Sequence, residues 1–114
     1  MKDMCGNIQY KGRDYKLVFN LNVMEAIQEE YGSLTAWGDL TDGSAGEPNA
    51  KAVIFGFTQM INEGIDICNE ENGTDDKPLT VKQVGRMITD YGLLEATKTM
   101  NKTVIDSTQS EVKN

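Results

Sequence analysis

The side chains best suited to chemistry in this sequence are two cysteines and three pairs of neighbouring acids. The chain of 114 residues contains no histidine, so neither Cys5 nor Cys68 has the usual base for nucleophilic catalysis. The acid pairs are Glu29-Glu30, Glu70-Glu71 and Asp75-Asp76. Each pair falls on a predicted exposed helix face or in a loop, where carboxylates do not acquire the unequal environments that acid–base catalysis needs. We therefore expect a protein that is not an enzyme and uses no cofactor.

A metal site is not expected either. Histidine, the commonest metal ligand, is missing. The acidic segment 69–76 fails as an EF-hand loop, because placing Gly73 at position 6 puts Cys68 at position 1 and Leu79 at position 12, where calcium needs oxygen ligands. The two thiols could in principle pair, but we expect both to stay reduced, since Cys68 falls on the apolar stripe of a predicted helix and cytoplasmic thiols are normally reduced.

The net charge argues against nucleic acid as a partner. The chain has 18 acidic and 11 basic side chains, which give a formal charge of −7. Nucleic-acid binding depends on clustered lysine and arginine, and the densest group here, Lys11, Arg13 and Lys16, is interrupted by Asp14. The N-terminal residues carry no apolar run of signal-peptide length, so we expect a cytoplasmic protein with no membrane contact.

Residues 7–19 predict a β-hairpin, because apolar and polar residues alternate on both sides of a turn at Gly12-Arg13. This turn gives a register in which Lys11 faces Asp14, Tyr10 faces Tyr15, Gln9 faces Lys16 and Ile8 faces Leu17. One face of the hairpin is then apolar, made by Ile8, Tyr10, Tyr15, Leu17 and Phe19. A lone hairpin is marginal in water, so this face must pack on the remainder of the chain.

The helical body is predicted over residues 22–105. Its first helix is capped by Asn20 or Asn22 and ends at Gly32, with Val23, Met24, Ile27 and Tyr31 on its apolar side. A short helical turn over 33–40 and a loop over 41–48 come before the strongest helical pattern, at 49–68. There the core stripe is Ala50, Val53, Ile54, Phe57, Met60, Ile61, Gly64, Ile65 and Cys68.

The C-terminal third predicts two more helices after an acidic loop at 69–77. Thr80 and Gln83 have capping-box spacing, and the stripe of that helix is Val81, Val84, Ile88 and Tyr91. After Gly92 a last helix begins near Leu93, turns Leu93 or Leu94, Thr97, Met100 and Val104 inward, and fades after Ile105 into a flexible polar tail at 106–114. The prediction is a mainly α fold in one small domain over 1–114, with an N-terminal β-hairpin followed by about four helices.

Three aromatic residues are candidates for an interaction surface. Phe55 lies about 80° outside the core stripe of its helix, on a polar face. Either the hairpin or the segment bearing Trp37 covers this ring, or the ring belongs to a surface that contacts a partner. Trp37 and Tyr31 join it as candidates for client binding or self-association, because they are large and stand at loop edges or beside polar residues.

The order of several motifs resembles that of small phage tail assembly chaperones, including the related gene transfer agent proteins. The run from Tyr15 to Ile27, Tyr-Lys-Leu-Val-Phe-Asn-Leu-Asn-Val-Met-Glu-Ala-Ile, resembles the opening of that family, and Tyr31-Gly32-Ser33 closes the helix in a similar way. A long apolar helix and then Leu79-Thr80-Val81-Lys82-Gln83-Val84-Gly85 follow in the same order. The resemblance covers residues 8–105.

The resemblance implies a non-enzymatic phage or prophage protein that binds the tape-measure protein, or another tail protein, during tail morphogenesis. Homo-oligomers are possible in such a role. The family has no agreed catalytic motif, so no functional residue is carried over from it. The alternative interpretation is an acidic phage-encoded regulator, or a DNA-mimic-like inhibitor of a host protein; a structural component of the virion is a third.

Overall fold

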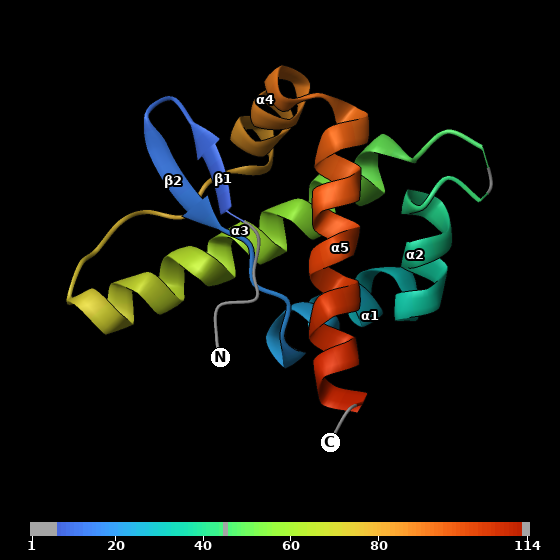
Figure 1. The fold of residues 1–114 in the computed structure, drawn as a ribbon, viewed down its shortest axis with the longest axis horizontal. Helices are drawn as coiled ribbons and strands as arrows, with labels where there is room; N and C mark the ends of the chain where they lie inside the picture. Colours follow the sequence, from blue (N-terminus) through green and yellow to red (C-terminus); the bar gives the residue numbers. More distant parts are fainter. Residues whose placement is uncertain (1–6, 45, 113–114) are drawn as a thin grey trace.

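The elements follow one another in the predicted order, strands first and helices after them. The computed structural model describes residues 7–44 and 46–112, and Figure 1 shows its fold. Its elements are β1 (Asn7–Tyr10), β2 (Arg13–Lys16), α1 (Leu21–Tyr31), α2 (Leu34–Thr41), α3 (Ala50–Asn72), α4 (Val81–Tyr91) and α5 (Leu93–Val112). The prediction of a mainly α fold with an N-terminal hairpin is confirmed. The described residues form five helices because the short segment before the 41–48 loop is a helix of its own.

The hairpin forms in a different register from the predicted one. Its turn lies at Lys11-Gly12, so that Ile8 pairs with Tyr15 and Tyr10 with Arg13. Both turn residues have positive φ, 51° at Lys11 and 79° at Gly12, which is the conformation of a type I′ turn and fits the twist of the two strands. Because the partners differ by two positions, the apolar residues still share one face.

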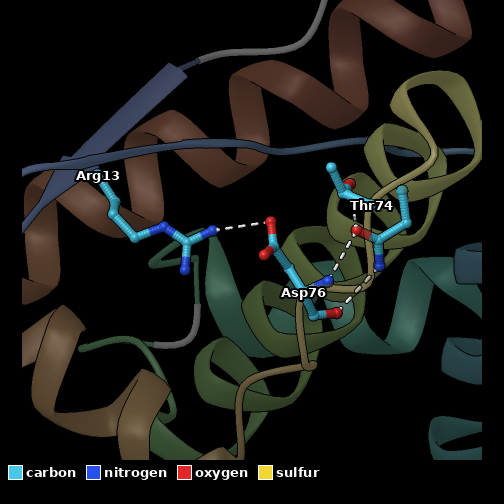
Figure 2. Close-up of polar contacts among 4 residues, drawn as sticks. Arg13, Thr74 and Asp76 are labelled. Carbon is cyan, nitrogen blue, oxygen red and sulfur yellow. Dashed lines mark hydrogen bonds and ion pairs between the residues drawn. The ribbon is translucent and has the colours of Figure 1, made fainter.

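Helix α3 is longer at its C-terminus than the sequence predicts. It continues through Asn72 and ends at Gly73, whose φ of 67° supplies the left-handed cap. Beyond the cap, the Asn69 side chain fixes the following loop: its Oδ1 accepts from Thr74 Oγ1 (2.8 Å) and from the Asp76 N–H (3.0 Å). Figure 2 shows this network and the Arg13–Asp76 ion pair (3.2 Å) that joins the loop to the hairpin. The predicted acidic loop therefore begins after Asn72.

Helix α5 is also longer than predicted, and the expected tail at 106–112 is helical. No glycine or proline follows Ile105 in this segment to stop the helix. The Lys102–Asp106 pair (2.8 Å) spans one turn across the predicted end. Residues 113 and 114 of the predicted tail lie outside the described residues.

The core lies around α3, against which the hairpin and the other helices pack (Figure 1). Its largest fully buried side chains are Trp37, Phe57, Ile8, Leu17, Ile27, Met60, Ile61, Met87, Met100, Val23, Val53 and Val84. Two glycines let neighbours approach α3 closely: Gly64 lies under the backbone of Lys16 in β2, and Gly56 under the ring of Trp37. All described elements thus share one core.

Three end positions of the helices depart from the predicted stripes. Val81 and Tyr91, the first and last residues of α4, are 56% and 39% exposed, while the interior residue Met87 is buried. At the start of α3, Ala50 is exposed. These three terminal residues lie at the edge of the tertiary contacts, so the periodic pattern alone overestimates their burial. The Thr80–Gln83 capping box and the caps at Asn20 and Gly32 are confirmed.

Candidate functional site

The structure brings two of the three candidate aromatic residues together. Tyr31 at the end of α1 and Phe55 on α3 contact each other edge to face, with ring centroids 5.5 Å apart and an interplanar angle of 70°. Phe55 is therefore covered in part by the end of α1, an element that was not among those expected to cover it. Both rings are partly buried against the core. They form a packing pair and expose less apolar surface than the sequence suggests.

The hydroxyl group of Tyr31 is the one buried side-chain polar atom without a hydrogen-bond partner among the described residues. Burial raises the pKa of this phenol above its ordinary value, and the neighbouring carboxylate of Glu30 raises the pKa further. The hydroxyl is thus a destabilising feature of an otherwise apolar contact.

Trp37 is not a surface residue, and its prediction as part of an exposed surface is wrong. Its side chain is 1% exposed, and its indole Nε1–H donates to the carbonyl oxygen of Ala52 at 2.9 Å. The ring is buried because α2 folds back onto the first turns of α3, where Gly56 leaves room for it. Trp37 therefore positions α2 and the loop that follows.

A large surface hollow lies elsewhere, between the α2–α3 loop and one side of α5, the orange and red helix of Figure 1. This groove is open to solvent and has a volume of about 840 Å³. It is lined by Thr41, Asp42, Gly43, Gly46, Glu47 and Pro48 from the loop side, and by Leu94, Glu95, Thr97, Lys98, Thr99, Asn101, Lys102 and Ile105 from α5. We call it the α5 groove.

Two exposed aliphatic side chains mark the ends of the α5 wall. Leu94 is 67% exposed and Ile105 is 52% exposed. At about 100° per residue, eleven positions return to within about 20° of the same direction, so these two side chains share one face, separated by roughly 16 Å or three turns. Lys98 lies between them, about 40° from Leu94. A continuous strip of about three turns is therefore available to a partner.

The opposite wall is held in place by the loop's own contacts. The N–H of Asn49 donates to the carbonyl of Leu40 at 2.7 Å, closing the loop at its base. Asp42 Oδ1 accepts from the Ser44 N–H at 2.8 Å, and this bond holds the pKa of Asp42 below its ordinary value. Under the groove, the fully buried Thr41 reaches Asn101 of α5 at 3.5 Å. The two walls are thus connected at the floor of the groove.

The lining of the α5 groove has features that suit the binding of a ligand or partner. Its volume is in the range of ligand-binding clefts, and most of the surface that lines it is apolar. Within residues 7–44 and 46–112, no group of three or more histidine, cysteine or acidic side chains stands close enough to hold a metal ion. Cys68 is half-buried, and Cys5 lies outside the described residues.

Sequence reasoning did not find this groove. The pattern leaves open whether Leu93 or Leu94 faces inward; the structure places Leu93 partly in the core and Leu94 outside. The available signal is a second stripe on α5, because Leu94, Asn101 and Ile105 recur at seven and four positions and are separate from the buried residues Ala96, Met100 and Thr103.

Comparison with known proteins gives no relative: no family model, curated protein or solved structure matches the chain. Of the helices that the structure describes, none has the length and apolar character needed to cross a membrane.

Proposed function

We propose that this chain is a phage or prophage tail assembly chaperone, which holds a helical segment of the tape-measure protein in the host cytoplasm while the tail is built. The observation that carries the proposal is the α5 groove, with Leu94 and Ile105 exposed at its two ends. The class of client comes from the resemblance of the sequence motifs to those of tail assembly chaperones.

The dimensions of the groove support a helix as the occupant. Leu94 and Ile105 are separated by about three helical turns. Apolar residues recur about once per turn on one side of an amphipathic helix, so a client helix can place one of them against each of these two side chains. Helix-in-groove recognition uses such anchors against a preformed apolar surface. A long helical client would offer many segments of this kind.

The chemistry of the protein supports holding a client as its role. A holding chaperone needs apolar side chains that grip the client and a charged body that keeps the complex in solution. The exposed aliphatic residues of the groove provide the first, and the net charge of −7 provides the second. None of these features requires a reacting group.

Affinity purification tests this proposal. The protein would be tagged, expressed with its neighbouring genes, and purified at moderate salt, with mass spectrometry of the copurifying chains. We expect recovery of a very long, helix-rich protein encoded close by. Leu94→Gln and Ile105→Gln should each reduce this recovery, because they remove an apolar anchor without disturbing the core.

Matched controls are available on the same chain. Leu21, 72% exposed, corresponds to Leu94, and Val81, 56% exposed, corresponds to Ile105, but neither lines the groove. Leu21→Gln and Val81→Gln should leave recovery unchanged. Recovery of a host nuclease, polymerase or repressor in place of the long protein would contradict the chaperone proposal and favour an acidic regulator. Equal losses in all four variants would contradict the assignment to the groove.

A further inference from the structure

We propose that the α5 groove selects cationic segments: an amphipathic helix whose apolar face is flanked by lysine or arginine. This inference rests on the proposed function, since it takes the groove as the place where a client helix lies. It adds the charge of the segment that the groove accepts.

The charges in the lining carry the inference. The groove holds three carboxylates, from Asp42, Glu47 and Glu95, and two ammonium groups, from Lys98 and Lys102. Lys102 is already paired with Asp106 of its own helix at 2.8 Å, so its charge is largely balanced within α5. The groove is therefore acidic, in a protein that is itself strongly acidic.

The positions of these groups define which side of the occupant must be basic. Asp42 and Glu47 belong to the loop wall, whereas Leu94 and Ile105 belong to the α5 wall. A helix that turns its apolar face toward α5 presents one flank to the loop, beside the two carboxylates. Lysine or arginine on that flank gains favourable electrostatic energy there, while glutamate or aspartate meets like charge.

The same charges disfavour a second copy of this chain as the occupant. An antiparallel pairing of two α5 helices would bring Leu94 of one copy to Ile105 of the other, because the two residues are symmetric about the middle of the strip. It would also bring Lys98 of both copies onto the same strip, between two bodies of charge −7 each. A cationic helix from another protein avoids the repulsion between two acidic bodies, and its basic flank faces the loop wall rather than Lys98.

Three designed peptides test the inference directly. Each is an amphipathic helix of roughly 15 residues, or about four turns, with the same leucine face and with lysine, glutamine or glutamate at the flanking positions. The dissociation constant of each fluorescein-labelled peptide is measured by fluorescence anisotropy with the full chain. We expect the lysine peptide to bind at least about tenfold more tightly than the glutamate peptide at about 0.05 M salt, and the ratio to shrink at about 0.3 M.

A charge-neutral variant locates the effect. The double substitution Asp42→Asn with Glu47→Gln should weaken the lysine peptide and leave the glutamine peptide unchanged. Asparagine at position 42 keeps the side-chain oxygen that accepts from the Ser44 N–H, so the loop retains its contact. The matched control is Glu70→Gln with Glu71→Gln, which removes the same charge from exposed positions at the far end of α3.

The outcomes separate this inference from the proposed function. Equal binding of the lysine and glutamate peptides, with both lost in Leu94→Gln, would overturn the charge preference and leave the groove as a docking site. Tighter binding of the glutamate peptide, or a Leu94-dependent dimer in sedimentation velocity, would also overturn it. Failure of all three peptides to respond to Leu94→Gln would contradict the proposed function as well.

Discussion

Gly56 lies so close to Trp37 that a Cβ at position 56 would stand 2.9 Å from Cε2 of the indole, with a second ring atom closer still. This contact allows α2 to lie on α3, and the Trp37–Ala52 hydrogen bond fixes its position there. Because α2 leads directly into the loop wall of the α5 groove, the contact in the core determines where that wall stands.

The first prediction concerns this close approach. Gly56→Ala should destabilise the protein by about 1–3 kcal/mol, because the ring or the helix must move to admit a methyl group. Chemical denaturation measures the change in the free energy of unfolding. Gly38→Ala is the control: it lies in α2 with nothing within 4 Å of the added Cβ, and it should be neutral or stabilising by up to about 1 kcal/mol. Equal destabilisation in both variants would contradict the packing described.

The second prediction uses the single tryptophan of the chain. Because Trp37 is 1% exposed, its fluorescence emission should be blue-shifted and weakly quenched by acrylamide in the folded protein. Unfolding should shift the emission to longer wavelength and make quenching efficient. Efficient quenching before unfolding would mean that α2 leaves Trp37 at the surface.

The third prediction concerns the hydroxyl of Tyr31, which is buried without a partner among the described residues. Tyr31→Phe should raise the free energy of unfolding by about 1 kcal/mol, because the variant no longer buries an unsatisfied polar group. A loss of stability on the same scale would instead show that the hydroxyl has a partner. Thermal or urea denaturation at neutral pH measures the change.

Tyr31 should also lower the stability of the folded protein at alkaline pH. The pKa of Tyr31 is raised in the folded state, so above the ordinary tyrosine pKa of about 10 the phenol ionises more readily in the unfolded chain. The free energy of unfolding therefore falls as the pH rises from about 10 toward the folded-state pKa. The wild-type protein should therefore lose stability above pH about 10 more steeply than Tyr31→Phe does. Parallel curves for the two proteins would contradict the burial of the phenol.

The fourth prediction concerns the acid limb of peptide binding. The pKa of Asp42 is lowered by its hydrogen bond with the Ser44 N–H, so more than half of the Asp42 carboxylate is charged at a pH of about 3.9, where an ordinary aspartate is half protonated. The difference in lysine-peptide affinity between wild type and Asp42→Asn should persist as the pH falls to about 4 and disappear only below the folded-state pKa. Loss of this affinity difference already near pH 5 would contradict the lowered pKa of Asp42.

The sequence predicts most reliably the features that depend only on residues close together along the chain. Asn20 and Gly32 were predictable as helix caps, and Thr80 with Gln83 as a capping box, because these contacts involve residues only a few positions apart. The apolar face of the hairpin was predictable for the same reason, but its register was not. The positive φ adopted by Lys11 is uncommon outside glycine, so the pattern favoured a turn one position later.

The groove required information that local patterns do not contain. Whether Leu93 or Leu94 enters the core depends on how α5 is rotated against its neighbours, and adjacent helical residues point about 100° apart. The burial of Trp37 depends likewise on a glycine nineteen positions away, at Gly56. Both outcomes are set by tertiary packing. For this reason the three aromatic residues predicted for an interaction surface lie in or against the core, whereas the exposed Leu94 and Ile105 were not predicted.

The central claim is that a client helix lies along α5 between Leu94 and Ile105. Site-specific photocrosslinking tests it most directly: p-benzoylphenylalanine is placed at position 94, or at the similarly exposed position 21 as a control, in cells that express the neighbouring genes. Mass spectrometry then identifies the crosslinked partner. The account predicts crosslinks from position 94 to the long, helix-rich tail protein and none from position 21. Equal crosslinking from both positions, or crosslinks from position 94 only to other proteins, would contradict it.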